Sequence, residues 1–333
     1  MFVLDSYAWA VVFCVITMLC WGSWANTQKL AGRAWRFELF YWDYVLGVFL
    51  LSVIMAFTLG SFGDSGRRFL ADVSQADFGS LVSALVGGVV FNIANILLVA
   101  AIAIAGMSVA FPVGIGLALV LGVVVNYLAS PVGNPVSLFI GVGLVAMAIV
   151  LDAAAYRRLP SQSRGVTTKG LILSVLCGIL MGFFYRFVAD SMSTDFQNLE
   201  PGKLGPYSAV FFFSVGLLVS NFVLNPIIMK KPFVGDPVPM SEYFKGGFGL
   251  HSIGILGGLI WGVGMTFSII ASGQAGFAIS YGLGQGATMV AALWGVFIWK
   301  EFKEAPGSTG LLLTLMFLGY LVGLALIIAA RFQ

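Results

Sequence analysis

Charged residues are scarce in this chain, and so are the residues from which metal sites are built. Only 9% of the 333 residues are charged, whereas a soluble domain carries about 25%. There is one histidine, and the three cysteines form no Cys-x-x-Cys pair. These shortages exclude an ordinary soluble domain, and they leave a metal centre or a disulfide framework without support. We expect Cys14, Cys20 and Cys177 to be buried small side chains.

Several functional motifs are also missing. The chain has no G-x-x-x-x-G-K phosphate loop and no aromatic-basic RNA motif, and its net charge is only +3. A nucleic-acid partner is therefore not expected, and neither a cofactor nor a metal is indicated. Membrane-embedded enzymes need clustered carboxylates, histidine pairs or metal ligands, and the chain has no such cluster, so no catalytic residue is assigned.

Apolar residues are what the sequence has in abundance. They make up 59% of the chain, and the mean hydropathy is +1.00. A helix that crosses a bilayer core of about 30 Å needs about 20 apolar residues. The predicted fold is therefore all-α, a polytopic membrane protein in contact with lipid. It has ten spans: Tyr7–Gln28, Phe40–Gly60, Phe78–Ala103, Ser108–Leu128, Pro135–Asp152, Leu171–Asp190, Tyr207–Ile228, Gly249–Ile270, Ala275–Trp299 and Thr309–Ala330.

The basic residues are distributed unevenly over the loops. Of the 17 lysines and arginines, 12 follow odd-numbered spans and 4 lie on the opposite side, with Arg186 inside a span. Basic loops stay in the cytoplasm, so both termini are expected outside it, in a plasma membrane of the bacterial inner-membrane kind. The leader before the first span has no Lys or Arg and no A-x-A site follows it, so we expect a retained helix.

One stretch of the chain occurs twice. Residues Gly87–Val120 return 170 positions later as Gly257–Val290, with eight of 34 positions identical, five of them glycines. Five spans are an odd number, so a second copy must enter the membrane from the opposite side, which is typical of many secondary transporters. We expect a first five-helix repeat over residues 1–158, a cytoplasmic connector over 159–169 and an inverted second repeat over 170–333.

Glycines of the duplicated stretch are candidates for helix packing. In lipid, helices associate where small residues allow close approach of their backbones. The sequence predicts a tight contact between spans 4 and 9 through Gly114, Gly116, Gly284 and Gly286.

Two carboxylates open the second span. Glu38 lies at the predicted cytoplasmic boundary and Asp43 lies five residues deeper, which is about 7 Å further and about 140° around the helix. The two side chains therefore face different directions and do not form an acid/base pair. Both are candidates for proton coupling, Asp43 first. The alternative for Asp43 is a solvated or lysine-paired interfacial carboxylate.

Other polar and aromatic side chains inside the spans are candidate ligand contacts. Arg186 lies four residues before Asp190, so the two can pair on one helix face; the alternatives are a structural pair and a guanidinium that contacts substrate. Tryptophans of span 1 offer a flat surface for stacking or serve as lipid anchors. Uncharged amides and hydroxyls suit a neutral polar ligand, with interhelical hydrogen bonding as the alternative. The candidates are Trp21, Trp24, Asn26, Asn92, Asn95, Arg186, Trp261, Tyr281 and Gln285.

The single histidine is not among the candidates. His251 lies near the predicted cytoplasmic end of span 8, and no carboxylate is near it in the sequence. We expect it to be a surface or capping residue.

Together these residues resemble a known family. Ten spans in two halves, the CWGSW run of span 1, the YWDYVLG opening of span 2 and the basic connector after span 5 are similar to the drug/metabolite transporter superfamily. Within it, the chain resembles the branch of plant ureide permeases and bacterial sugar-uptake permeases of the rhamnose–proton symporter kind. The connector here is shorter than the long loop of the plant permeases, so nucleotide control is not expected.

The resemblance implies uptake of a small neutral polar metabolite with a proton, by alternating access. The substrate classes that it leaves open are ureides, nucleobases, nucleosides and monosaccharides. The alternatives are an exporter of the same superfamily, a lipid-modifying membrane enzyme, and a channel or scaffold. Direction of transport, coupling ion and oligomeric state are not fixed by the sequence.

Overall fold

The computed structural model describes residues 1–32, 35–159 and 167–332, and these residues form a helical bundle. Ten of its helical segments are long and apolar enough to cross a membrane, as predicted, and their ends lie within five residues of the predicted ones. The first half consists of α1 (Tyr7–Ser23), α2 (Ala25–Ala31), α3 (Phe37–Phe57), α4 (Phe69–Gln75), α5 (Phe78–Ala105), α6 (Met107–Ala110), the π-helical turn η2 (Phe111–Ile115), α7 (Gly116–Ala129) and α8 (Pro135–Tyr156).

The second half contains the same number of spans. It consists of α9 (Thr168–Ser191), α10 (Pro206–Lys230), the 3₁₀ helix η4 (Met240–Lys245), α11 (Phe248–Ala275), α12 (Phe277–Gly284), α13 (Ala287–Leu293), the π-helical turn η5 (Trp294–Ile298) and α14 (Thr309–Ala329). Within the described ranges, the all-α prediction is confirmed, since the one extended pairing there is an isolated bridge between Met192 and Leu204. The connector 159–169 falls largely on residues 160–166, which lie outside the described residues.

Three spans are interrupted helices. The first turns at Trp24 between α1 and α2, the fourth contains η2, and the ninth contains η5. Pro112 explains the interruption in the fourth span, because a proline has no backbone N–H to continue the ladder. The hydrogen bond there runs instead from the N–H of Gly116 to the carbonyl of Phe111, five residues back.

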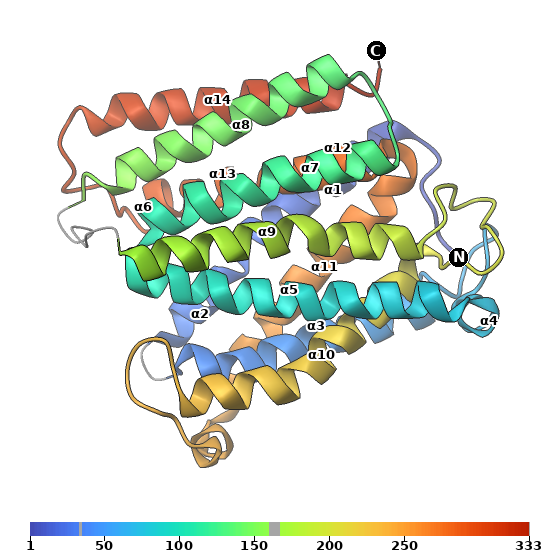
Figure 1. The fold of residues 1–333 in the computed structure, drawn as a ribbon, viewed down its shortest axis with the longest axis horizontal. Coiled ribbons are helices and arrows are strands. Elements are labelled where there is room, and N and C mark those ends of the chain that lie inside the picture. The colour runs from blue at the N-terminus through green and yellow to red at the C-terminus, as the bar shows by residue number, and fades with distance from the viewer. Residues whose placement is uncertain (33–34, 160–166, 333) are drawn as a thin grey trace.

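At each edge of the bundle, two helices pack together as a pair. Helices α8 and α14 pack together along one edge, and α3 and α10 along the other, with α5, α9 and α11 between them (Figure 1). The termini lie at the same end, because Tyr7 donates a hydrogen bond to the carbonyl of Ile328 over 2.8 Å and Gln274 donates one to the carbonyl of Leu4 over 2.9 Å. The connector side lies at the opposite end, where Gly170 of α9 meets Ala105 of α5.

Glycine brings the central helices into backbone contact. A Cβ added to Gly88 of α5 would overlap the carbonyl oxygen of Phe213 in α10. A Cβ added to Gly258 of α11 would overlap the carbonyl oxygen of Tyr44 in α3. Such close approach substitutes for the hydrophobic force that is absent between helices in lipid.

The four glycines expected to join spans 4 and 9 face other helices instead, so that prediction is wrong: they are Gly114, Gly116, Gly284 and Gly286. The first pair faces α9 and α8, and the second pair faces α1. Spans 4 and 9 meet at Gly122 of α7, which leaves room for the ring of Tyr281 from α12. Small residues on one helix predict a close neighbour, but they do not say which helix it is.

Candidate functional site

A cavity of about 400 Å³ lies between α1, α2, α5, η2, α9, α11, α12 and α13. It extends from mid-depth, at Trp21 and Gln285, to the connector end, at Gln28, Ala103 and Ala291. Its volume is in the range that holds a small metabolite. The lining residues are Trp21, Gly22, Trp24, Ala25, Gln28, Phe91, Asn95, Leu98, Val99, Ile102, Ala103, Phe111, Ile115, Met181, Phe184, Trp261, Gln285, Ala287, Thr288 and Ala291.

Aromatic rings form the inner wall of this cavity. The Trp21 and Trp261 rings stack with their centroids 5.8 Å apart and their planes 12° apart, and the Trp21 indole N–H donates to the carbonyl of Trp261 over 3.3 Å. Phe91 also packs on Trp261, with a centroid distance of 4.4 Å. The wall is thus held in place from several helices, and it presents a flat apolar surface to a ligand.

Two amide side chains provide fixed polar groups beside the rings. Asn95 donates from Nδ2 to the Tyr41 hydroxyl over 3.2 Å, and that hydroxyl donates to Oδ1 of Asn92 over 2.9 Å. Within the described residues, Oδ1 of Asn95 and the whole side-chain amide of Gln285 have no hydrogen-bond partner. The cavity therefore offers an oriented acceptor and a free amide to a ligand.

The cavity contains no charge of its own. Among the described residues that line it, the polar side chains are Gln28, Asn95, Gln285 and Thr288 and the tryptophans, and none of the lining residues is ionisable. An unpaired charge at membrane depth is costly. The arrangement therefore suits a neutral ligand with amide, carbonyl or hydroxyl groups and an apolar or planar face.

Five of the nine predicted contact residues lie in the cavity wall, from four different spans: Trp21, Trp24, Asn95, Trp261 and Gln285. The other four lie outside it. Asn26 accepts a hydrogen bond from the Trp299 indole over 2.6 Å, and Asn92 holds Tyr41 in place. Arg186 forms an ion pair with Asp190, and the Tyr281 hydroxyl donates to the carbonyl of Met181 over 3.0 Å.

Fifteen of the twenty lining residues were not among the predicted contacts, and Gln28, Phe91 and Phe184 are three of them. Gln28 lies seven positions after Trp21, and therefore on the same helix face, so helical spacing was the signal that would have found it. Phe91 occupies the position in the first copy of the duplicated stretch that Trp261 occupies in the second. Phe184 has no comparable signal, because nothing in the sequence says which face of α9 meets the cavity.

Asp43 lies outside the cavity, in a polar cluster on the other face of α3. Its carboxylate accepts a hydrogen bond from the Trp35 indole over 3.1 Å and one from the Tyr243 hydroxyl over 2.6 Å. Nδ1 of His251 lies 2.9 Å from the same carboxylate. Asp43 is 1% exposed and the His251 side chain is 25% exposed, so the histidine is the solvent-facing member of the pair. Asp43 is thus neither solvated nor paired with a lysine.

This cluster corrects the interpretation of the histidine. His251 was expected to lack a carboxylate, but Asp43 reaches it from 208 positions away in the sequence. Burial, together with the hydrogen bond to Asp43, raises the pKa of the Tyr243 hydroxyl, so Tyr243 remains a neutral donor. Glu38 takes no part, because Arg36 binds it over 2.7 Å.

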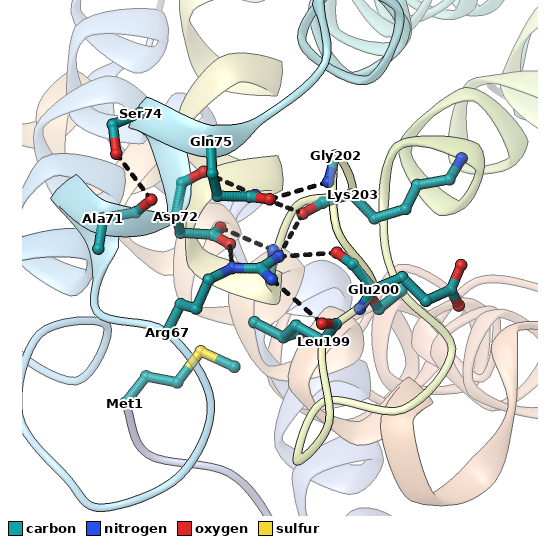
Figure 2. Close-up of polar contacts among 12 residues, drawn as sticks. Met1, Arg67, Ala71, Asp72, Ser74, Gln75, Leu199, Glu200, Gly202 and Lys203 are labelled. Carbon is teal, nitrogen blue, oxygen red and sulfur yellow. Dashed lines mark hydrogen bonds and ion pairs between the residues drawn. The ribbon is translucent and has the colours of Figure 1, made fainter.

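The end of the bundle opposite the cavity mouth is closed by a polar network (Figure 2). Arg67 binds Asp72 over 3.0 Å and donates to three backbone carbonyls of the loop 199–203. The other oxygen of Asp72 accepts the backbone N–H of Gly205 over 2.7 Å. The α3–α5 connection is thereby attached to the α9–α10 loop, which belongs to the other half of the chain.

Ten spans around a cavity of ligand size, with a polar network at one end of the bundle, are the architecture of a membrane transporter. The sequence model of the family described as Ureide permease matches residues 40–165 and 161–330, so the chain belongs to the ureide permease family. The family inferred from the residues is thereby confirmed.

Curated relatives agree with this assignment. Ureide permease 1 of Arabidopsis thaliana is 24% identical over 386 residues, which cover 99% of this chain and 99% of that protein. The probable glucose uptake protein GlcU of Staphylococcus aureus is 25% identical over 169 residues, which cover 51% of each chain. A solved crystal structure with 15% identity superposes with a TM-score of 0.59 over 97% of both chains, and that likeness shows the fold alone.

Proposed function

We propose that the protein is a secondary active transporter that imports a small neutral polar metabolite by alternating access. The observation that carries the proposal is the uncharged cavity, in which Asn95 and Gln285 offer unused hydrogen-bonding groups beside stacked tryptophans. A ureide has the amide and carbonyl groups that these side chains bind, and the names of the relatives point to ureides and to glucose. Nucleobases, nucleosides and other monosaccharides share this chemistry.

Alternating access would use the two halves as opposed units, inverted relative to each other. Repeated contacts support the inversion. Gly88 of the first half packs on Phe213 and Leu217 of the second half. Gly258, 170 positions after Gly88, packs on Tyr44 and Val48 of the first half, which lie 169 positions before Phe213 and Leu217. Helices α5 and α11 both have 28 residues, and each ends at a glycine with positive φ.

The basic loops favour a cytoplasmic location for the cavity mouth, with both termini outside the cytoplasm. The conformation is then inward-open, in the plasma membrane of a bacterial cell. Asp64→Cys and Lys303→Cys, at opposite ends of the bundle, test this orientation in a background without the native cysteines. An impermeant thiol reagent should label position 64 on intact cells and position 303 only after permeabilisation. The reverse pattern would overturn the orientation.

Proton coupling is assigned to Asp43 together with His251. Nδ1 of His251 lies 2.9 Å from the Asp43 carboxylate, so a proton bound by either group would change the net charge of the pair by one unit. The same helix, α3, touches the cavity framework on its other face, where Tyr41 holds Asn95 and Tyr44 packs on Trp24 at 4.7 Å. A change of charge at Asp43 would therefore act on the contacts that hold α3 against α11 and the η4 loop, and through α3 on the cavity.

The experiment has two stages. A thermal-shift screen of the purified protein against ureides, nucleobases, nucleosides and monosaccharides identifies the ligand, whose uptake is then measured in proteoliposomes with an imposed pH gradient. Asp43→Asn should abolish accumulation driven by the gradient and preserve exchange of ligand across the membrane. Asp236→Asn removes an exposed carboxylate at the same end of the bundle and should leave both unchanged. Accumulation at the wild-type level in the Asp43 variant would remove the coupling role, and a gradient-driven loss of ligand would favour export.

A further inference from the structure

One of the four buried carboxylates in the described part of the chain, Asp152, lies outside the cavity and the Asp43 cluster and has no partner there. Asp152 is in α8, four residues from the end of the helix, and is 3% exposed. Its Oδ1 has no solvent contact, and within the described residues neither carboxylate oxygen has a hydrogen-bond or ion-pair partner. By contrast, Asp43 and Asp72 each have partners on both oxygens.

Among the described residues, the groups that interact with Asp152 are two tyrosines and a glutamate, and none of them is a cation. Tyr156 lies one helical turn further along α8, Glu301 comes from the segment after η5, and Tyr320 comes from α14. Glu301 is already paired with Lys29 over 2.7 Å and accepts a hydrogen bond from the Tyr156 hydroxyl over 2.8 Å. The other elements packed on α8 are α6, η2 and α7, and the only titratable residue in them, Tyr127, lies at the far end of α7.

These surroundings decide the state of the carboxyl group. A buried charge without a partner is strongly disfavoured, so a buried carboxyl group that lacks one takes up a proton instead. A second acid, Glu301, adds repulsion to that cost, and Lys29 pairs with Glu301 rather than with Asp152. We propose that Asp152 is a proton-binding site, whose carboxyl group stays protonated and neutral in this conformation of the protein at neutral pH.

The position of Asp152 also suggests a route for the proton. The Glu301 side chain is 30% exposed at the connector end, and Tyr320 lies beside both Asp152 and Thr288, which lines the cavity. Release of the proton first requires a hydrogen bond between Asp152 and the Tyr156 oxygen, which is absent in this conformation. The Asp152 carboxyl then passes its proton to the Tyr156 oxygen while the Tyr156 hydroxyl proton moves to Glu301. Asp152 is then a carboxylate and Glu301 is neutral. This route rests on the proposed transport function, whereas the protonation of Asp152 does not.

Infrared spectroscopy of the purified, ligand-free protein tests the site without knowledge of the substrate. A protonated carboxyl group has a carbonyl stretch that is separate from the amide and carboxylate bands and that moves on exchange into D₂O. At neutral pH this band should be present in the wild type, absent in Asp152→Asn and retained in Asp43→Asn, the matched control. Tyr320→Phe should shift the band, because it removes an α14 hydroxyl that interacts electrostatically with the carboxyl group.

Stability measured against pH gives an independent readout. A proton that is held in the folded protein and released on unfolding makes the folded state less stable as pH rises, by about tenfold in the unfolding equilibrium per pH unit. The wild type should therefore lose thermal stability with rising pH, and Asp152→Asn should lose less. If the Asn variant does not fold, the band shift in Tyr320→Phe remains the test. A neutral-pH spectrum unchanged by both substitutions would show an ionised Asp152 and overturn the proposal.

Discussion

The two halves of the chain use glycine alike and polar side chains differently. Gly88 of α5 and Gly258 of α11 lie 170 positions apart, and each presses against a backbone carbonyl of the opposite half. Seven positions after each glycine, the first half has Asn95, which lines the cavity, and the second half has Met265, which is buried away from it.

This difference between the halves shows that backbone contacts and cavity-lining positions constrain the sequence in different ways. Where backbone meets backbone, no side chain larger than hydrogen fits, so the same residue is found in both halves. Where a side chain meets the cavity, the geometry accepts many residues, so each half contributes its own polar group. The first half provides Asn95, whereas the second provides Gln285, whose counterpart in the first half is Ile115.

The largest predicted effect is on the shared glycine contacts. Gly88→Ala and Gly258→Ala should each destabilise the protein by about 3 kcal/mol, because the added methyl group meets rigid backbone rather than a movable side chain. The measurement is the midpoint of thermal unfolding in detergent. If the two halves pack in equivalent ways, the unfolding midpoint should decrease by a similar amount in both variants.

The same two helices contain the matched controls. Gly79 of α5 and Gly249 of α11 are also 170 positions apart, and an added Cβ at either position meets nothing within 4 Å. Alanine at these positions should leave the midpoint unchanged or raise it slightly, since alanine is the better helix former. A lower unfolding midpoint in only one of the two variants, Gly88→Ala or Gly258→Ala, would contradict the equivalence of the halves.

A smaller effect is expected where the halves differ. Asn95→Leu and Gln285→Leu should each weaken binding of the ligand found in the thermal-shift screen by about tenfold, the value of one hydrogen bond to a neutral group. Gln197→Leu, at an exposed position on the sealed end, should leave affinity unchanged. Calorimetric titration of the three variants checks this, and wild-type affinity in both cavity variants would remove their role in binding.

The sequence predicted the helices of this fold better than it predicted which helices contact one another. Span number and length follow from hydrophobicity, because a bilayer sets a minimum run of apolar residues. Helical spacing also places side chains four residues apart, such as Tyr281 and Gln285, on one helix face. It did not show what the face meets: Tyr281 enters the space left by Gly122, and only Gln285 reaches the cavity.

Contacts between distant segments were the part that sequence reasoning missed. His251 looked isolated because its carboxylate lies in another span, and the pairing depends on how α3 crosses α11. Asp152 was placed at the end of a span, where water would solvate it, but α8 continues to Tyr156 and α14 covers the carboxyl group. A single sequence encodes these crossings only through packing, which no local pattern describes.

The smallest predicted effect on stability concerns Asp195, in the loop that joins the first two spans of the second half. Residues 32–36 make this connection in the first half and residues 192–205 in the second, where Asp195 organises the longer loop. Asp195 accepts hydrogen bonds from the Asn198 side chain over 3.0 Å and the Gln197 backbone over 2.8 Å, and these bonds lower the pKa of its carboxyl group, the Asn198 amide most. The carboxyl group is solvated, so its contribution is below about 1 kcal/mol.

The sign of its pH dependence follows from the lowered pKa. Because the folded protein holds the Asp195 proton less tightly than the unfolded chain does, its contribution is complete above the unfolded value of 3.8 and is lost as the pH falls through the lower folded value. Asp195→Ala should therefore lower the unfolding midpoint slightly at pH 7, and this difference should vanish in acid. Asp64→Ala, at another exposed position on the same end, controls for the loss of one negative charge. A loss of several kcal/mol in Asp195→Ala would mean that the longer loop of the second half, rather than the Arg67 network, holds the sealed end closed.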